Sequence, residues 1–459
     1  MKNWRSKRIL IIGAGRQGLA LARYLSQKGA DVLVTDRRPA EDLQSELNTL
    51  SELKISFVLG DHPLELLDGC DLVCPSGGVP LTIPIIVEAQ DRGISLSNDS
   101  QIFLEAVPCP VIGVTGSSGK TTVTSLLGRM VQVALGSGRT WVGGNIGNPL
   151  ISDVEKMEPD HLAVMELSSF QLEIMTKAPQ VAGVLNLTPN HLDRHKTMEA
   201  YTRAKGRILR FQDPNHLAVL NREDQGSWSL RDLIKGKLIS FGKGRPKGYQ
   251  AGVFIQDETI VFWDGEDIRD LLPRESIALR GEHNLYNVLA ACALAVAAEI
   301  PVEAIASGVE GFSGVEHRLE FIREWGGAAW FNDSIATTPE RAVAAIRSFD
   351  RPLVLLAGGR DKDLPWSDFA EVVHQRVDHL VLFGEAVEII LEAIGPLNPG
   401  ERPFTVDSYD TLSTAIQLAV DLIETGDVVL LSPGGTSFDE FHDFAERGAF
   451  FKQWVKNLT

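Results

Sequence analysis

The strongest chemical signature in the chain is TGSSGKTT, at residues 115–122, which continues an apolar run at residues 111–115. A strand that leads through a glycine-rich loop into a helix presents backbone N–H groups to nucleotide phosphates. Lys120 would neutralise charge on the β- and γ-phosphates, and the Thr121 hydroxyl would hold magnesium. Val114 stands where the strict pattern has glycine, so this is a variant P-loop, and a glycine turn that binds nothing is the alternative. The residues expected to bind ATP in this loop are Gly116, Ser117, Ser118, Gly119, Lys120, Thr121 and Thr122.

A second glycine motif, GAGRQG at residues 13–18, lies between an apolar run and a helical segment, and Asp36 ends the next apolar run. Glycines at this spacing allow a tight turn and the close approach of a phosphate to a helix N-terminus. The pattern is typical of dinucleotide-binding proteins, but such loops also form structural turns or bind other nucleotides. An NAD-linked oxidoreductase is therefore a rival interpretation, although it leaves the loop at residues 115–122 unexplained.

The elements that position these loops alternate between strand and helix patterns. Short apolar runs followed by helical spacing, beginning at residues 7–12, predict parallel βαβ units. Pro108 and Pro110 mark one connector, and the glycine-rich stretch at residues 308–318 marks a second boundary. We predict three α/β domains: an N-terminal Rossmann-like domain at residues 1–107, a central P-loop ATPase domain with a mostly parallel sheet at residues 108–313, and a C-terminal Rossmann-like α/β domain at residues 314–459.

The composition is that of a globular protein and disfavours several functional classes. The 459 residues are 44% hydrophobic and 23% charged, and the formal charge of −17 is spread along the chain, which disfavours nucleic-acid binding. The longest apolar stretch, residues 288–300, is shorter than the roughly 20 residues that span a bilayer, so we expect no membrane insertion. The four cysteines form no metal-ligand pattern, which favours reduced core thiols. We expect a cytoplasmic monomer.

Six further motifs follow the P-loop along the chain. They are GGN at residues 143–145, MELSSFQLE at 165–173, LNLTPNHLDRH at 185–195, YTRAKGRI at 201–208, GEHNLYN at 281–287 and HR at 317–318. In type, order and spacing they resemble the Mur ligase family, over essentially the whole chain. The resemblance implies an ATP-dependent amide ligase that uses magnesium. Three more elements resemble family members that add D-glutamate to UDP-N-acetylmuramoyl-L-alanine in peptidoglycan synthesis: NDSIAT at residues 332–337, GGRDKD at 358–363 and LSPGGTSFDEF at 431–441.

The resemblance implies catalytic roles for Lys120, Glu166, His191 and Lys205. Glu166 ends an apolar run, where a carboxylate could bind magnesium, and the resemblance makes His191 a ligand of a second magnesium ion. The implied metal ligands are therefore Thr121, Glu166 and His191. Lys205 is implied to be carbamylated, a modification that requires a neutral amine. Judged alone, the histidine would be an unliganded loop residue and the lysine a solvated side chain.

The remaining predicted residues hold the substrates. Those implied to contact the UDP substrate are Arg16, Gln17, Gly18, Asp36, Arg37, Gly78, Asn145 and Ser168. Those implied to hold the acceptor amino acid are Arg38, Thr337, Lys362, Ser437, Phe438 and Phe444. Asn284, Arg318 and Asp333 are implied to contact ATP, the last two from a third domain that closes on the nucleotide. A helix-capping role is the alternative for Asn284.

Departures from the family pattern leave part of the prediction open. Ile335 stands where the pattern has lysine, so a cation is missing unless Arg341 or Lys362 compensates, and L-glutamate or another acceptor remains an alternative to D-glutamate. Ser117 and Ser118 replace Thr and Asn, with little effect expected because backbone N–H groups bind the phosphates. A P-loop switch protein is a further rival, which would hydrolyse ATP without an acceptor.

Overall fold

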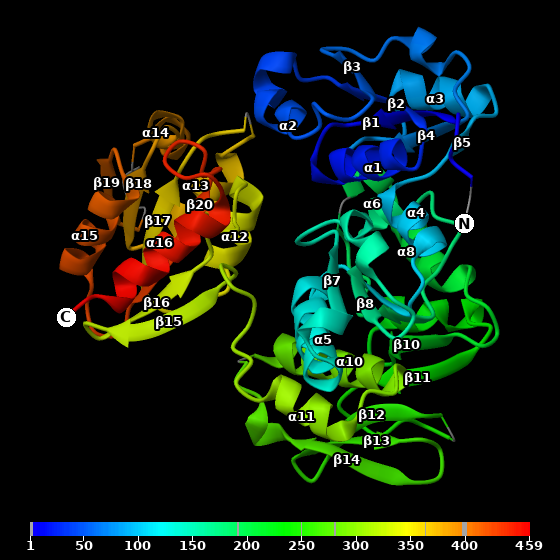
Figure 1. Cartoon of the computed structure of the whole chain (residues 1–459). Helices are drawn as coiled ribbons and strands as arrows, with labels where there is room; N and C mark the ends of the chain where they lie inside the picture. The colour runs from blue at the N-terminus through cyan, green and yellow to red at the C-terminus, as the bar shows by residue number, and fades with distance from the viewer. Residues whose placement is uncertain (1–2, 191, 249, 280, 363, 397–401) are drawn as a thin grey trace. The chain divides into compact units, whose positions relative to one another are not determined.

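The computed structural model describes residues 3–190, 192–248, 250–279, 281–362, 364–396 and 402–459. The chain divides into two compact units, Met1–Phe312 and Ser313–Thr459 (Figure 1). The second unit begins one residue before the predicted start of the third domain. The predicted boundary at residues 107 and 108 falls inside the first unit, between helix α4 (Asp99–Ala106) and strand β6 (Val111–Thr115).

The first domain is a parallel sheet in the order β3-β2-β1-β4-β5. Its strands are β1 (Arg8–Ile12), β2 (Asp31–Asp36), β3 (Ile55–Leu59), β4 (Leu72–Pro75) and β5 (Ser95–Leu96), and its other helices are α1 (Arg16–Gln27), α2 (Gln44–Asn48) and α3 (Pro84–Asp91). Ile9 and Ile11 of β1 and the buried apolar residues of α1 belong to one core with residues of the second domain, such as Met165 and Ile208. This shared core explains why the two domains form one unit.

The second domain contains a sheet in the order β14-β13-β12-β11-β10-β9-β6-β8-β7 within the described residues. Its strands are β6, β7 (Thr140–Gly144), β8 (Leu162–Glu166), β9 (Val181–Val184), β10 (Leu217–Asn221), β11 (Lys237–Phe241), β12 (Gly252–Gln256), β13 (Thr259–Trp263) and β14 (Ile268–Pro273). All neighbours pair in parallel except β12 with β13 and β13 with β14. The mostly parallel sheet is as predicted, whereas the antiparallel edge was missed. The apolar run at residues 181–187 predicts a strand over its whole length, but β9 ends at Val184, because the chain then runs beside the P-loop, where the backbone oxygen of Asn186 accepts a hydrogen bond from Ser117.

Helices cover both faces of this sheet. They are α5 (Lys120–Leu135), α6 (Ser169–Leu172), α7 (Leu192–His195), α8 (Met198–Arg210), α9 (Gln225–Ser229), α10 (Glu282–Ala297) and α11 (Val302–Val309). Helix α10 is buried along most of its length, and its small residues allow close packing on the sheet. A Cβ atom at Gly183 of β9 would lie 2.9 Å from Leu294 of α10, so the glycine is needed for this approach. No helix in the described residues is long and apolar enough to cross a membrane.

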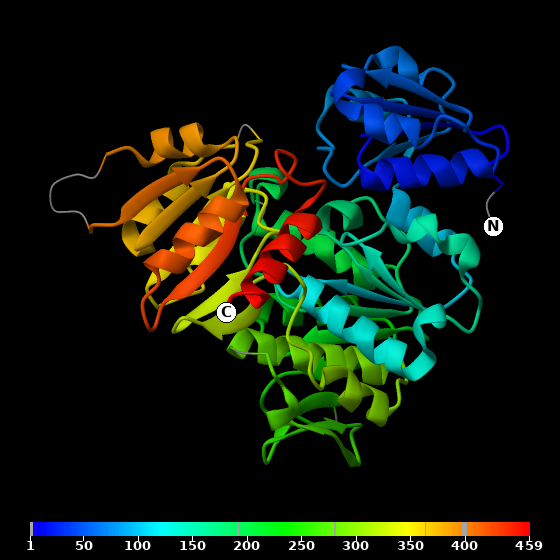
Figure 2. The same ribbon diagram turned by 60° about the vertical axis from the view of Figure 1, so that its left-hand side comes forward.

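The second unit is a sheet in the order β15-β16-β20-β17-β18-β19, parallel except for the pair β15 and β16. Its strands are β15 (Glu320–Trp325), β16 (Ala328–Asn332), β17 (Leu353–Gly358), β18 (His379–Phe383), β19 (Thr405–Tyr409) and β20 (Val428–Gly434), and its helices are α12 (Pro339–Ile346), α13 (Ser367–Arg376), α14 (Val387–Ile394), α15 (Leu412–Leu422) and α16 (Phe444–Lys456). Helices α12 to α14 cover one face, and α15 and α16 cover the other (Figure 2).

Candidate active site

The P-loop joins β6 to α5. Strand β6 is buried along its whole length, and Gly119, the N-cap of α5, has a φ of 78°, a left-handed conformation that glycine adopts without strain. Lys120 folds back over the loop, where its Nζ donates hydrogen bonds to the backbone oxygens of Gly116, at 3.0 Å, and Ser117, at 3.2 Å. The loop thus holds a cation beside the N-terminus of a helix, an arrangement suited to the phosphates of a nucleotide.

Side chains from neighbouring elements hold the P-loop in place. Asn186, after β9, accepts a hydrogen bond from the N–H of Ser118 at 2.9 Å, and its backbone oxygen accepts one from the N–H of Ser117 at 2.9 Å. The Ser117 hydroxyl donates to the backbone oxygen of Thr188 and lies 3.0 Å from the hydroxyl of Tyr201 in α8. Because β9, β6 and β8 are adjacent parallel strands, their following loops meet at one edge of the sheet.

Glu166 ends β8 and is only 1% exposed. One carboxylate oxygen accepts a hydrogen bond from the Thr121 hydroxyl at 3.0 Å, and the other accepts one from the Asn145 amide at 2.7 Å. Carboxylate and hydroxyl oxygens are ligands that Mg²⁺ takes, with water and nucleotide phosphates completing its shell. No cluster of three or more His, Cys, Asp or Glu that could hold a metal occurs in the described residues. The oxygen atoms of Thr121 and Glu166 are chemically suited to a magnesium ion that arrives with a nucleotide.

Lys205 lies on α8 and is 1% exposed, so its interpretation as a solvated side chain is wrong. Its Nζ donates to Thr115 Oγ1 at 3.2 Å and lies 5.0 Å from the centroid of the Tyr201 ring. Burial lowers the pKa of Lys205 well below its usual range, nearby Lys120 lowers it further, and Glu166 opposes both effects. The site therefore favours the neutral amine, because a second charged ammonium would be desolvated beside Lys120.

His191 lies outside the described residues, so its predicted role as a metal ligand stays a prediction. The residues that follow it make packing contacts. The His195 ring stacks on Phe170, with centroids 5.3 Å apart, and its Nε2 lies 2.9 Å from Ser169 Oγ. Arg194 donates to the backbone oxygen of Gly78 at 3.1 Å, which joins this segment to the first domain.

Helix α10 begins beside the P-loop. Gly281 is its N-cap and Asn284 lies in its first turn, so the capping alternative for Asn284 is wrong. Asn284 Oδ1 accepts a hydrogen bond from Asn287 Nδ2 at 3.1 Å. A Cβ atom at Gly119 would lie 2.2 Å from Asn287 Oδ1, so Asn287 packs directly on the P-loop backbone. Sequence reasoning missed Asn287, although its place one turn after Asn284 puts it on the same helix face.

A cavity of about 450 Å³ lies where the first domain meets the second domain within the first unit. The predicted UDP-substrate residues that line it are Arg16, Gln17, Gly78, Asn145 and Ser168. Asn145 also donates to Glu166, so the cavity adjoins the candidate magnesium ligand. Gly18 is not among the described residues that line this cavity. A Cβ atom there would lie 2.0 Å from the backbone oxygen of Gly13, which makes Gly18 a packing residue.

Asp36 and Arg38 form a pair in the first domain. Asp36 accepts hydrogen bonds from the N–H of Ala14 at 2.7 Å, from the N–H of Arg38 at 2.9 Å, and from the Arg38 guanidinium at 3.1 and 3.0 Å. Burial raises the pKa of Asp36, but the bonds from Arg38 and Ala14 outweigh it and lower the pKa to about 2. The carboxylate thus ties the glycine loop to the end of β2. Neither Asp36 nor the exposed Arg37 is among the residues that line the cavity.

The second unit places the predicted nucleotide residues after β16 and before β15. Asp333 is buried, and its carboxylate accepts hydrogen bonds from the N–H of Leu319 at 3.1 Å and the Ser432 hydroxyl at 2.9 Å. Burial raises the pKa of Asp333 to about 7, against the opposing effects of these bonds and of Arg318. Arg318 is exposed and follows His317, whose φ of 62° turns the chain sharply.

The predicted acceptor residues of this unit lie in three loops and at the start of α16. Lys362, after β17, donates to the Thr337 hydroxyl at 3.5 Å. Ser437, after β20, is buried, whereas the adjacent Phe438 is 60% exposed. Phe444 is the first residue of α16. The loops therefore present a cation and an exposed aromatic ring.

Arg447 in α16 connects these loops and was missed in the sequence. It is completely buried, and it donates to the hydroxyl and backbone oxygen of Ser334 and to the backbone oxygens of Thr436 and Gly435, at 2.9 to 3.1 Å. Burial lowers the pKa of Arg447 to about 10, and the guanidinium remains charged at neutral pH. The sequence gives little indication of this role. Arg447 follows Phe444 by three residues, which places both on the same face of α16, and no other feature of the sequence singles it out.

Comparison with known proteins agrees with this arrangement. Three family profiles match: the Mur ligase MurD-like N-terminal domain at residues 7–98, the Mur ligase middle domain at residues 114–295, and the Mur ligase glutamate ligase domain at residues 317–435. The UDP-N-acetylmuramoylalanine--D-glutamate ligase of Symbiobacterium thermophilum is 38% identical over 454 residues, which cover 99% of this chain and 98% of that protein. The enzyme of the same name from Pelotomaculum thermopropionicum is 38% identical over 459 residues, with 100% and 99% covered.

The solved structure of the UDP-N-acetylmuramate-alanine ligase MurC from Thermotoga maritima matches with a TM-score of 0.54 at 19% identity, over 98% of this chain and 99% of that one. At this identity the match shows the shared fold. The predicted α/β fold class and the predicted family are both confirmed. From its matched domains and its full-length relatives, the chain belongs to the Mur ligase family.

Proposed function

We propose that this chain is the ATP-dependent ligase that joins D-glutamate to UDP-N-acetylmuramoyl-L-alanine in peptidoglycan precursor synthesis, acting as a monomer in the cytoplasm. The observation that carries the proposal is the convergence of the P-loop, the buried carboxylate of Glu166 and the buried amine of Lys205 beside a cavity of about 450 Å³. Full-length relatives at 35% to 38% identity are named for this reaction. An oxidoreductase would leave all three groups without a role.

The first step activates the carboxylate of the UDP substrate. The backbone N–H groups of the P-loop and the Lys120 ammonium hold the triphosphate. A carboxylate oxygen of UDP-N-acetylmuramoyl-L-alanine attacks the γ-phosphorus, the bond from that phosphorus to the bridging oxygen breaks, and ADP leaves. The product is an acyl phosphate. Lys120 stabilises the negative charge that develops on the phosphate oxygens.

The second step forms the amide. The neutral amine of D-glutamate attacks the acyl carbon, and the tetrahedral intermediate collapses as its carbon–oxygen bond to phosphate breaks. Phosphate leaves and the nitrogen releases its proton to solvent. The residues that hold the amino acid contribute mainly by orientation, since an amine fixed near the acyl carbon reacts as if at high concentration.

Magnesium, when bound, neutralises charge on the triphosphate, and Thr121 and Glu166 are the described residues that would hold it. We include His191 as the ligand of a second ion. We also propose carbamylation of Lys205, in which the neutral amine attacks carbon dioxide and loses a proton. The lowered pKa supports the neutral amine, and Lys120 offers a cation to the carbamate.

Arg341 is our candidate for the cation that Ile335 lacks. Its guanidinium donates to the backbone oxygen of Ile335 at 3.2 Å. Burial lowers the pKa of Lys362, and Arg341 lowers it further, so the two cations lie close together. Two adjacent cations suit an amino acid that carries two carboxylates. On this basis D-glutamate remains the proposed acceptor despite the absent lysine.

The test is ATP-dependent phosphate release with UDP-N-acetylmuramoyl-L-alanine and D-glutamate, L-glutamate or no amino acid, with product mass measured in each case. We expect phosphate and a new amide only with D-glutamate. Preference for L-glutamate would refute the acceptor assignment, and phosphate release without any acceptor would indicate a switch ATPase. The variant Arg341→Gln should raise the KM for D-glutamate at least several-fold, whereas Arg347→Gln, on the same unit, should not.

A further inference from the structure

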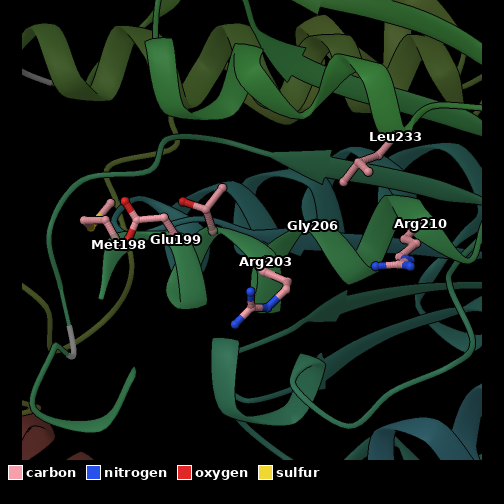
Figure 3. A pocket seen from close by; sticks show the side chains of 7 residues that line it. Met198, Glu199, Arg203, Gly206, Arg210 and Leu233 are labelled. Carbon is pink, nitrogen blue, oxygen red and sulfur yellow. The ribbon is translucent and has the colours of Figure 1, made fainter. Parts of the chain in front are cut away.

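Helix α8 carries a second cavity, on a face other than the one that holds Lys205. The cavity has a volume of about 400 Å³ (Figure 3). Glu199, Arg203, Gly206 and Arg210 of its lining are spaced by four, three and four residues, so they share one face of the helix. Figure 3 shows Arg203 and Arg210 on either side of Gly206.

The absent side chain of Gly206 shapes this cavity. A Cβ atom at Gly206 would lie 2.9 Å from Leu233 and 3.2 Å from Leu230, both in the short 3₁₀ helix Leu230–Leu233. The glycine therefore lets that helix approach α8 closely. Leu233 remains partly exposed and supplies an apolar wall beside the two arginines.

The lining of the cavity carries two arginines, Arg203 and Arg210, against one acid, Glu199, whereas the chain as a whole is acidic. Arg203 and Arg210 are exposed, and neither forms an ion pair with a carboxylate within the described part of the chain. Burial raises the pKa of the nearby Glu173 carboxyl above its ordinary value, and Arg194, Arg207 and Arg203 offset that rise only in part. Cations thus outnumber acids along this helix, in a chain whose formal charge is −17. Such a local excess of positive charge attracts small anions.

We propose that this cavity is a binding site for a small dianion whose anionic groups are phosphates or carboxylates. Guanidinium groups match the oxygens of both kinds of group with paired N–H donors. Residues 203 and 210 are about 10.5 Å apart along the helix axis, a gap that two arginine side chains span from either side of Gly206. Leu233 contacts the apolar body of the ligand. The site is separate from the P-loop, which lies towards the Lys205 face of α8.

The test is calorimetric titration of the full chain, saturated with ADP and magnesium so that the P-loop is occupied. Inorganic pyrophosphate and succinate serve as phosphate and carboxylate probes. The double variant Arg203→Gln with Arg210→Gln removes both guanidinium groups. Arg269→Gln with Arg274→Gln is the matched control, because it removes two exposed arginines, one from β14 and one from the short 3₁₀ helix that follows it.

We expect at least one probe to bind the unaltered chain and the control equally, and the Arg203 and Arg210 variant to bind it at least about tenfold more weakly. Hydrogen exchange should show protection of residues 198–210 by the probe in the first two proteins and none in the third. The probe that binds identifies the anion class. Failure of both probes to bind, or equal binding by all three proteins, would overturn the proposal.

Discussion

Replacing Asp36 with asparagine should destabilise the N-terminal domain by an amount that depends on pH. The carboxylate accepts hydrogen bonds from the N–H groups of Ala14 and Arg38 and two from the Arg38 guanidinium. An asparagine keeps one acceptor oxygen, but its NH₂ group cannot accept from the donors that face the other oxygen. The variant also removes the negative charge that faces Arg38. We therefore expect the substitution to reduce the stability of the domain more than it reduces substrate binding.

The size of the effect follows from the two pKa values. The ordinary value is 3.8, and the hydrogen bonds that outweigh burial lower the pKa of Asp36 to about 2 in the folded protein. A depressed folded-state pKa stabilises the fold fully above the unfolded value, and this stabilisation is lost as pH falls through the folded value. The difference corresponds to about 2 kcal/mol at pH 7 and about 1 kcal/mol near pH 3.

The assay is hydrogen exchange across a urea series between pH 3 and pH 7, read on peptides from β1 to β2. These peptides report the unfolding free energy of the domain that contains Asp36. Asp42→Asn, a change at an exposed acid of the same domain, is the control and should have little effect at any pH. A loss for Asp36→Asn that is constant from pH 3 to pH 7, or no larger than the control, would refute the reasoning.

Four further changes test the central site and the second unit. Glu166→Gln should keep the fold but lower kcat/KM by about 10²–10³ and raise the magnesium requirement, measured by phosphate release across magnesium concentrations; unchanged turnover would contradict a metal role. Gly119→Ala should lower the unfolding free energy, measured by thermal unfolding, by about 1–3 kcal/mol and weaken ATP binding, because the new Cβ meets Asn287. Adding Asn287→Ala should restore only part of the lost stability, since residue 119 still has a positive φ. Lys205→Met should abolish ligation. Burial depresses the pKa of Lys205 in the folded protein, so the unfolded chain binds more protons at neutral pH. The unfolding free energy of the unaltered protein should therefore increase relative to that of the variant as pH rises from 7 towards 10. A difference in unfolding free energy, measured in urea, that does not change with pH would contradict this prediction. Arg447→Met should lower the unfolding free energy of the second unit by about 3 kcal/mol, read by hydrogen exchange, because four hydrogen bonds are lost.

The buried strands were predictable from sequence because each is a short apolar run that ends in a loop of small or polar residues. Strands β6, β8 and β17 are buried throughout, and β6 coincides with the apolar run at residues 111–115. Strands such as β14 and β15 were missed because charged residues interrupt them and few of their side chains are buried. Their pairing depends on neighbours that sequence periodicity does not reveal.

The motifs located the candidate site, but they did not reveal which side chains would meet. Lys205 has the sequence context of a solvated lysine, and its burial depends on Thr115, which lies 90 residues earlier. Arg447 is similar, since its partner Ser334 lies 113 residues earlier in the chain. Contacts of this kind arise from how sheets and helices pack, so a single sequence carries little trace of them.

Asn145 connects the cavity to the candidate magnesium site. It lines the cavity and donates to one oxygen of Glu166, while Thr121 donates to the other. A carboxylate has about four lone-pair positions, so two remain for a cation. The Thr121 hydroxyl gives its only hydrogen to Glu166, which leaves its own lone pairs free to bind the same cation. The two hydrogen bonds therefore orient both candidate ligands without blocking either, and a substrate that shifts Asn145 would reorient the carboxylate that we propose as a metal ligand.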